Sequence, residues 1–289
     1  MTQRPPRPRR SVLYAPATNA KALAKIAVLD CDAVVIDLED PVAAGKKAAA
    51  RDAVVRFFAD GGAGTKETVI RINALSTEWG RDDLLAARAC RPNAILLPKV
   101  DGPRDILEAD RMLDRADAPE LWLWAMIETP RAMLNIGAIA ELGRDNAARL
   151  ACLVAGTNDL VKDTGIKATP DRRYLMPWLM QMVLAARAGG LDILDGVSND
   201  FRDLDAFGLE CAQGADMGFD GKTLIHPAQI GPANSAFSPS ADDVEAALAI
   251  RAAFAQDGNR DKGVISIDGK MVERLHLEQA ERLLARSGR

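Results

Sequence analysis

The sequence has few aromatic side chains and no excess of positive charge. Aromatic residues make up 4% of the 289 residues, and 37 basic side chains stand against 41 acidic ones, which gives a net charge of −4. Proteins that bind nucleic acid use a positive surface and aromatic rings that stack on bases. We therefore expect no nucleic-acid partner.

Cysteine is also scarce. The four cysteines are widely spaced, and no two of them form a CxxC pair. This spacing is untypical of a zinc site or of a disulfide framework. We expect reduced, buried thiols in a cytoplasmic protein.

No apolar run is long enough to cross a membrane. The longest runs, such as "LACLVAG" at 150–156, have the length of a strand, whereas a membrane-spanning helix needs about 20 apolar residues. The basic start "MTQRPPRPRR" is not followed by an apolar segment of the kind found in signal peptides. We expect no membrane association and interpret residues 1–10 as a disordered basic tail.

Short apolar runs alternate with helical segments along most of the chain. The runs lie at 11–16, 33–39, 68–73, 94–100, 121–128, 150–156, 191–197 and 215–226. Near-continuous apolar strands are typical of a parallel sheet that is covered on both faces. Eight such units predict an α/β fold, a closed (β/α)8 TIM barrel over residues 11–238. No GxGxxG motif follows the first strand, which argues against an open dinucleotide-binding sheet.

Residues 239–289 depart from this alternation. Ser240 is placed to cap a helix over 240–256, and the pair Asp268-Gly269 is placed to turn a hairpin over 263–272. An amphipathic helix ends the chain. We expect a C-terminal helical and hairpin extension, too small for a core of its own, that packs on the barrel or on a neighbouring subunit.

Polar residues gather where the predicted strands end. The carboxyl ends of the strands form one rim of a (β/α)8 barrel, and active sites lie at that rim. The polar residues at these ends are Glu39, Asp40, Arg71, Asn73, Lys99, Glu128, Asp159, Lys222 and His226. Each one alone is readily explained as a salt-bridged rim residue, or for His226 as a structural hydrogen bonder. So many on one rim favour a functional site.

The residue types at this rim narrow the chemistry. Carboxylate oxygens without clustered histidine or cysteine suit Mg²⁺, which takes one or two carboxylates and completes its shell with water or substrate. Arg71 and Lys99 beside such an ion imply an anionic substrate, since a guanidinium fork matches a carboxylate. Asp37, on the same strand face as Glu39, is expected to pair with a basic side chain inside the barrel.

Several segments together resemble one enzyme family. They are "RSVLYAPATNAKALAK", "VVIDLEDPV", "VIRIN", "LLPKV", "IETPRAMLNI", "GFDGKTLIHPAQI" and "NSAFSPS". In this order the chain resembles the citrate lyase β-subunit and malyl-CoA lyase family, the CitE-like branch of the HpcH/HpaI aldolases. The resemblance implies a Mg²⁺-dependent barrel that assembles as a homotrimer or hexamer. It also implies chemistry on a C–C bond beside a CoA or carrier-bound thioester, with a small oxo acid as the second partner.

The resemblance further implies roles for residues of the rim. It makes Glu128 and Asp159 the metal ligands, and it makes Arg71 the residue that binds the oxo-acid oxygens. Glu39 and Asp40 would lie beside the waters of the metal.

Four more residues take roles from the resemblance. Lys99 would shape the pocket electrostatically. Asp268, in "SIDGKMV", matches an aspartate that is catalytic in malyl-CoA and citramalyl-CoA lyases and comes from an adjacent subunit, whereas the sequence alone explains it as a turn residue. Lys21 and Lys25 are candidates for binding the CoA phosphates, or are simply exposed lysines.

The reaction implied is reversible cleavage of a 3-hydroxyacyl-CoA into an oxo acid and an acyl-CoA. Malyl-CoA, methylmalyl-CoA and citramalyl-CoA all fit this description. A malyl-CoA thioesterase or malate synthase-like activity is the first alternative. A citrate lyase β-type subunit that acts on a carrier-bound thioester is the second.

Overall fold

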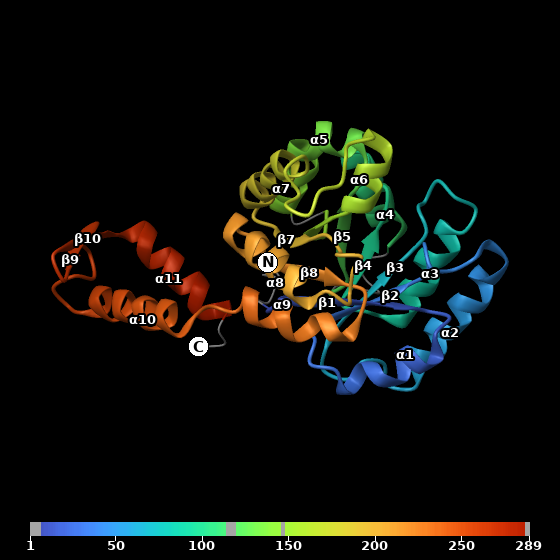
Figure 1. The fold of residues 1–289 in the computed structure, drawn as a ribbon, viewed down its shortest axis with the longest axis horizontal. Coiled ribbons are helices and arrows are strands. Elements are labelled where there is room, and N and C mark those ends of the chain that lie inside the picture. The colour runs from blue at the N-terminus through green and yellow to red at the C-terminus, as the bar shows by residue number, and fades with distance from the viewer. Residues whose placement is uncertain (1–6, 114–119, 146–147, 287–289) are drawn as a thin grey trace. The chain divides into compact units, whose positions relative to one another are not determined.

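Eight parallel strands close into a barrel in the order of the chain, and β8 pairs with β1 (Figure 1). The computed structural model describes residues 7–113, 120–145 and 148–286. The strands are β1 Ser11–Pro16, β2 Ala33–Asp37, β3 Glu67–Arg71, β4 Ala94–Leu97, β5 Trp122–Ile127, β6 Leu150–Ala155, β7 Asp192–Asp195 and β8 Gly221–Leu224. The predicted (β/α)8 barrel is confirmed.

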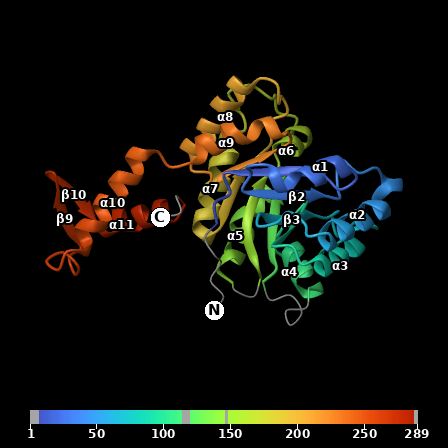
Figure 2. The same cartoon turned by 90° about the horizontal axis from the view of Figure 1, so that it is seen from below.

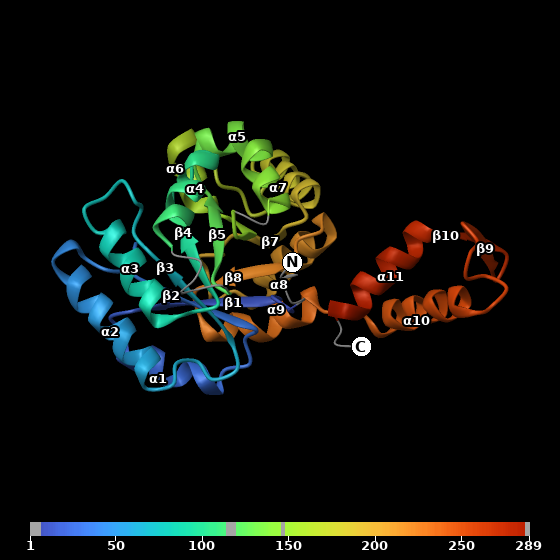
Figure 3. The ribbon, with the colours of Figure 1, turned by 180° about the vertical axis from the view of Figure 1, so that it is seen from behind.

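Helices surround the strands, as Figures 2 and 3 show from below and from behind. They are α1 Ala20–Lys25, α2 Lys47–Ala59, α3 Gly80–Cys90, α4 Pro103–Met112, α5 Pro130–Glu141, α6 Thr157–Thr164, α7 Met176–Gly189, α8 Leu204–Met217 and α9 Ile230–Phe237. Short 3₁₀ turns occur at Ile26–Val28, Ala44–Lys46, Leu142–Arg144 and Pro227–Gln229. Within the described residues, no helix is both long and apolar enough to cross a membrane.

The strand bodies are apolar because both of their faces are covered. Every residue of β2, β3 and β6 is buried. The interior of the barrel is filled by side chains such as Val35, Leu96, Trp124 and Val154. The polar side chains therefore come at the ends of the strands, where the sheet stops.

One strand end shows how the sequence places a polar residue at the rim. Strand β5 ends at Ile127, and Thr129 caps the next helix by accepting a hydrogen bond from the Ala132 N–H at 3.0 Å. Pro130 follows at the first helical position, where its missing N–H is not needed. Glu128 is thus held between the last residue of a strand and the cap of a helix.

Arg9 closes the amino-terminal end of the barrel. It is 8% exposed, its Nε and Nη2 each donate to Glu67 at 2.7 Å, and its Nη1 pairs with Asp192. A buried carboxylate such as Glu67 needs a charged partner, and Arg9 supplies it. The predicted disordered tail at 1–10 is wrong for this residue, and residues 1–6 lie outside the described part of the chain.

The chain divides into a barrel unit that runs to Ala236 and a second unit from Phe237 onward, close to the boundary predicted at 238. The second unit contains α10 Ala241–Ala255, β9 Val264–Ile267, β10 Lys270–Glu273 and α11 Arg274–Arg286. Ser240 caps α10 as predicted, since its hydroxyl accepts from the Asp243 N–H at 3.0 Å.

The second unit buries side chains of its own. Phe254, Ile265 and Val272 pack together under the hairpin. A second cluster joins α10 to α11 and consists of Val244, Ala247, Ala280 and Leu284. The expectation that this segment has no core of its own is wrong, because the helix pair and the hairpin cover each other.

The hairpin turns at Asp268 and Gly269, as the sequence predicts. Their φ angles are +49° and +76°. Two successive left-handed residues make a type I′ turn, which matches the twist of the two strands. Asp268 is exposed at this turn.

Candidate active site

A cavity of about 430 Å³ lies at the carboxyl ends of the barrel strands. Its lining includes Tyr14, Asp37, Asp40, Arg71, Glu128 and Asp159. These residues come from β1, β2, β3 and the segments that follow β2, β5 and β6. The rim at which the sequence places a site therefore does contain a cavity into which charged side chains project.

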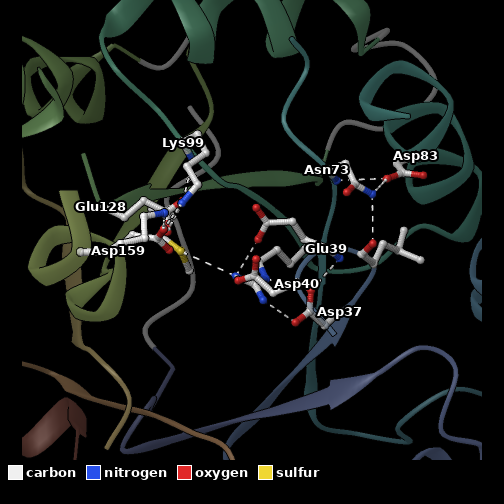
Figure 4. A network of polar contacts seen from close by, with 12 residues as sticks. Asp37, Glu39, Asp40, Asn73, Asp83, Lys99, Glu128 and Asp159 are labelled. Carbon is white, nitrogen blue, oxygen red and sulfur yellow. Dashed lines mark hydrogen bonds and ion pairs between the residues drawn. The ribbon is translucent and has the colours of Figure 1, made fainter. Parts of the chain in front are cut away.

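Arg71 lies among the three carboxylates of Asp37, Glu39 and Asp40, which Figure 4 labels. Its Nε and Nη2 donate to the two oxygens of Asp37 at 2.8 and 2.5 Å. Its Nη1 lies 2.8 Å from Glu39 Oε2 and 3.2 Å from Asp40 Oδ2. Burial lowers the pKa of Arg71, but Asp37 and the other neighbours raise it well above its ordinary value. The expected pairing of Asp37 with a basic side chain is confirmed.

Glu39 is an acid whose pKa burial changes strongly. Burial raises the pKa of Glu39 to about 8, with Asp40 and Glu128 adding to the effect and Arg71 opposing it. Its Oε2 is near Arg71 but accepts no hydrogen bond from any described residue. Glu39 therefore carries a proton near neutral pH until further positive charge enters the site.

Glu128 and Asp159 converge on one cationic point, which Lys99 occupies. The Lys99 Nζ lies 2.7 Å from Asp159 Oδ1 and 3.4 Å from Glu128 Oε2. The backbone N–H of Lys99 donates to Glu128 Oε1 at 2.7 Å. Lys99 has a φ of +51°, an uncommon left-handed backbone for a residue other than glycine.

The two acids differ in their readiness to ionise. Burial raises the pKa of Glu128, which is 1% exposed, to about 7. Burial also acts to raise the pKa of Asp159, but hydrogen bonds from Lys162 and Lys99 outweigh it and lower the value to about 2. Asp159 is therefore ionised near neutral pH, whereas Glu128 is only partly ionised there.

This donor pair fits a magnesium ion. Two hard oxygen donors already meet at one cation, and Mg²⁺ takes one or two carboxylates before water or substrate completes its octahedron. Among the described residues, no group of three or more His, Cys, Asp or Glu side chains is arranged to hold a metal. At Gly156 a Cβ atom would lie 2.2 Å from the Glu128 Cβ, so the close approach of the two segments requires glycine.

The charge balance of the site also favours a divalent cation. Among the described residues, the five carboxylates of Asp37, Glu39, Asp40, Glu128 and Asp159 contact three basic side chains, those of Arg71, Lys99 and the exposed Lys162. When all are ionised, two negative charges are in excess. An anionic substrate would be repelled by this site unless protons or a cation reduced that excess.

Two predicted rim residues lie elsewhere. Lys222 is fully buried and its Nζ binds Asp195 and Glu210 at 2.8 and 2.7 Å. Thr223 lines the cavity, and because side chains alternate along a strand, Lys222 faces the surrounding helices instead. Asn73 follows the end of β3 and is turned toward Lys47, so it does not line the cavity.

His226 has a structural role, as the sequence predicts. Its Nδ1 accepts a hydrogen bond from the Ala228 N–H at 3.1 Å, and its ring stacks on Phe201 with the centroids 4.5 Å apart. These contacts fix the start of the turn after β8.

A groove of about 990 Å³ adjoins the cavity, and Pro41 lines both. Lys46 and Arg56 are basic residues in its lining, together with small apolar side chains of α1 and α2. Lys21 and Lys25 are exposed on α1 and are not among its lining residues. A role for them in binding phosphate stays a prediction.

Tyr14 is the site residue that the sequence did not single out. It lines the cavity, its hydroxyl is buried without a hydrogen-bond partner among the described residues, and the Arg71 guanidinium lies 5.0 Å from its ring centre. Burial raises the pKa of Tyr14 well above its ordinary value. The signal that was available is strand alternation, because Tyr14 shares the inward face of β1 with the fully buried Val12.

The fold and the site together define a (β/α)8-barrel protein with an acidic pocket at the carboxyl ends of the barrel strands. Residues 10–227 match the HpcH/HpaI aldolase/citrate lyase family, and the chain belongs to this family. It is 45% identical over 280 residues to a (3S)-malyl-CoA thioesterase of Cereibacter sphaeroides, covering 97% of this chain and 95% of that one. It is 33% identical over 285 residues to the mitochondrial citramalyl-CoA lyase of Homo sapiens, covering 95% and 84% of the two chains.

A solved structure shares the fold over nearly the whole chain. It is the protein CitE of Mycobacterium tuberculosis in complex with magnesium, acetoacetate and coenzyme A. The TM-score is 0.75 at 30% sequence identity, and the match covers 96% of this chain and 98% of that one. The predicted resemblance to the citrate lyase β-subunit and malyl-CoA lyase group is confirmed.

Proposed function

We propose that the protein is a Mg²⁺-dependent carbon–carbon lyase that reversibly cleaves a 3-hydroxyacyl-CoA of the malyl-CoA type. The products are an oxo acid and an acyl-CoA. The observation that carries this proposal is the convergence of Glu128 and Asp159 on one cationic point in the pocket that contains Arg71. Relatives named for citramalyl-CoA cleavage, and a structural neighbour with magnesium, acetoacetate and coenzyme A, support it.

The residues of the pocket have separate roles in binding the substrate and in stabilising charge. Held by Glu128 and Asp159, Mg²⁺ would act as a Lewis acid toward the hydroxyl and carboxylate oxygens of the oxo-acid portion. Arg71 adds a fixed positive charge at the same oxygens, where charge changes as the C–C bond breaks. Asp37, Glu39 and Asp40 hold the Arg71 guanidinium in place.

Cleavage turns the substrate hydroxyl into a carbonyl and releases its proton, and it leaves an electron pair on the α-carbon of the acyl-CoA, where a proton must be added. We assign this proton to Asp268, and in the condensing direction Asp268 removes it. The assignment rests on the match of "SIDGKMV" to malyl-CoA and citramalyl-CoA lyases. In those lyases the matching aspartate comes from an adjacent subunit, so we place Asp268 in the site of a neighbouring subunit of a homo-oligomer.

The groove beside the cavity supplies room for the long CoA portion. Lys46 and Arg56 are the basic residues in its lining. Lys46 directly precedes α2, and Arg56 lies in its last turn. A CoA ester whose acyl group enters the cavity past Pro41 would bring its phosphates toward these side chains. Lys46 and Arg56 are therefore better candidates than Lys21 and Lys25 for the phosphate contacts.

Hydrolysis of the thioester is the second candidate function. The observation in its favour is the 45% identity to a (3S)-malyl-CoA thioesterase. In that reaction water attacks the thioester carbonyl, and malate and free CoA are released without C–C cleavage.

Product analysis separates the two functions. The purified protein is incubated with Mg²⁺ and, in turn, malyl-CoA, methylmalyl-CoA and citramalyl-CoA, and products are followed by liquid chromatography from the earliest time points. The proposal predicts an oxo acid and an acyl-CoA in equal amounts. Hydroxy acid and free CoA, with no oxo acid at any time, would show hydrolysis instead. The Glu128→Gln variant serves as the control for metal dependence.

A further inference from the structure

A buried polar cluster lies behind the segment that carries Glu39 and Asp40. Lys47, the first residue of α2, is 6% exposed. Its Nζ donates to the Leu38 carbonyl at 2.9 Å, the Glu39 carbonyl at 2.8 Å and Asn73 Oδ1 at 2.7 Å. An ammonium has three N–H donors, so every donor of Lys47 is used here.

Asn73 is fixed in turn by Asp83. The Asn73 Nδ2 and backbone N–H donate to Asp83 Oδ2 at 2.5 and 3.0 Å, and Nδ2 also donates to the Leu38 carbonyl at 3.0 Å. Asp83 is fully buried, and its Oδ1 accepts from Arg51 at 3.0 Å. Arg51 lies one turn after Lys47 on α2. We call Lys47, Arg51, Asn73 and Asp83 the Lys47 cluster.

The cluster acts on the backbone of the site and does not reach the cavity. None of its four residues lines the cavity, and Figure 4 shows Asn73 and Asp83 apart from the group formed by Lys99, Glu128 and Asp159. Two successive carbonyls, those of Leu38 and Glu39, point to one ammonium. In an extended strand successive carbonyls point to opposite sides, so this contact holds a turn directly after β2.

That turn determines the positions of the Glu39 and Asp40 carboxylates. Glu39 and Asp40 leave the barrel wall at this point, and both reach the same Nη1 of Arg71. The Glu39 N–H is also bound, since it donates to Asp37 Oδ1 at 2.9 Å. The backbone of Glu39 is therefore held on both sides, by the Lys47 ammonium and by Asp37.

We propose that Lys47 is a positioning residue for the carboxylates around Arg71. By binding the carbonyls of Leu38 and Glu39, it fixes the turn that presents Glu39 and Asp40 to the guanidinium, and Asn73 and Asp83 hold Lys47 in place. The proposal rests on the proposed function in one respect only, that Arg71 receives the oxo acid. It adds a requirement for a residue outside the pocket.

The first test compares Lys47→Met, which keeps the length of the side chain but has no donors, with wild type. The expected result is a loss of kcat/KM for malyl-CoA of about 100-fold, the scale of effect known for small misplacements of catalytic groups. Binding of Mn²⁺, measured by electron paramagnetic resonance, should change by less than about 3-fold, because neither Glu128 nor Asp159 is altered. Lys66→Met, at the amino-terminal end of β3, is the matched control and should behave as wild type.

A second measurement does not depend on turnover. Binding of glyoxylate to the Mg²⁺-loaded protein, measured by calorimetry, should weaken about 10-fold in Lys47→Met and not in Lys66→Met. If wild type binds glyoxylate but cleaves no CoA ester, the proposed reaction fails and the positioning proposal is still tested by this measurement. A folded Lys47→Met protein with wild-type glyoxylate affinity and wild-type kcat/KM would overturn the positioning role.

The variant Asp83→Asn covers the case in which Lys47→Met does not fold. It keeps Lys47 but weakens the bond that orients Asn73, so a smaller loss of glyoxylate affinity, about 3-fold, is expected with unchanged Mn²⁺ binding. Unchanged glyoxylate affinity in a folded Asp83→Asn protein would contradict the cluster. A parallel loss of glyoxylate and Mn²⁺ affinity would also contradict it, because that result indicates general disruption of the barrel rim.

Discussion

The ammonium of Lys99 lies 2.7 Å from Asp159 Oδ1, at the point where Glu128 and Asp159 converge. A divalent cation that binds both carboxylates must therefore share or take the place of this ammonium. Lys99 and the metal are competitors for the same negative charge.

Removing this competitor should tighten metal binding. We expect Lys99→Met to raise the affinity for Mg²⁺ by about 10-fold or more, which corresponds to at least about 1.4 kcal/mol. Calorimetry with Mg²⁺ measures this directly. Lys162→Met is the control: Lys162 contacts Asp159 but is exposed, so its charge is screened and its removal should have a smaller effect. Equal or weaker Mg²⁺ binding in Lys99→Met would contradict the competition.

Metal binding should release protons and become stronger as the pH rises. Burial raises the pKa of Glu128 to about 7 and that of Glu39 to about 8, so both hold protons at pH 6 when no metal is bound. A cation favours the ionised forms and displaces these protons, so affinity increases between pH 6 and pH 8. Calorimetry at pH 7 in buffers of different ionisation enthalpy should give different apparent enthalpies, and Glu39→Gln should reduce the difference. Identical enthalpies in all buffers would show that no proton leaves.

Tyr14 offers a stability test. A buried hydroxyl without a partner costs about 1–3 kcal/mol, and the Tyr14 hydroxyl finds no partner among the described residues. We expect Tyr14→Phe to leave the free energy of unfolding unchanged or to raise it by about 1 kcal/mol, measured by urea denaturation without substrate. The same variant should bind glyoxylate more weakly if the hydroxyl faces the oxo acid. A loss of more than about 1 kcal/mol would reveal a hydrogen bond or a bound water at this hydroxyl.

Asp268 should act across a subunit boundary. Asp268→Asn and Glu128→Gln are each expected to be inactive alone. Co-expressed and purified together, they should regain roughly a quarter of wild-type activity under random mixing, because some sites combine an intact Glu128 with an intact Asp268 of the neighbour. No recovery in a mixed oligomer would indicate that both residues serve the same site within one chain. Full activity of Asp268→Asn alone would remove Asp268 from the mechanism.

The sequence was most informative where residue type and periodicity decide the structure. Apolar runs such as 33–39 predict buried parallel strands, and the type I′ turn at Asp268 follows from the Asp-Gly pair. The direction of a side chain was harder to predict. Lys222 was expected at the rim because it lies in the eighth apolar run, at 215–226, but alternation along β8 turns its side chain to the outside of the barrel.

Long-range contacts could not be predicted from the sequence, for a physical reason. Arg9 is one of several arginines in a proline-rich start, and only the folded barrel brings the carboxylates of Glu67 and Asp192 to it. Lys47 binds two backbone carbonyls, and carbonyls are present in every residue type. No residue pattern marks such acceptors, whereas the carboxylates of the pocket are visible in the sequence itself.

The most direct test of the proposed reaction is its reverse. Acetyl-CoA and ¹³C-labelled glyoxylate are incubated with the protein and Mg²⁺, and the label is followed by nuclear magnetic resonance. A carbon–carbon lyase converts the label to malyl-CoA, which accumulates with no free malate at early times and does not form with Glu128→Gln. Label that stays in glyoxylate, while the same protein releases free CoA and malate from added malyl-CoA, would contradict the lyase assignment and establish the thioesterase.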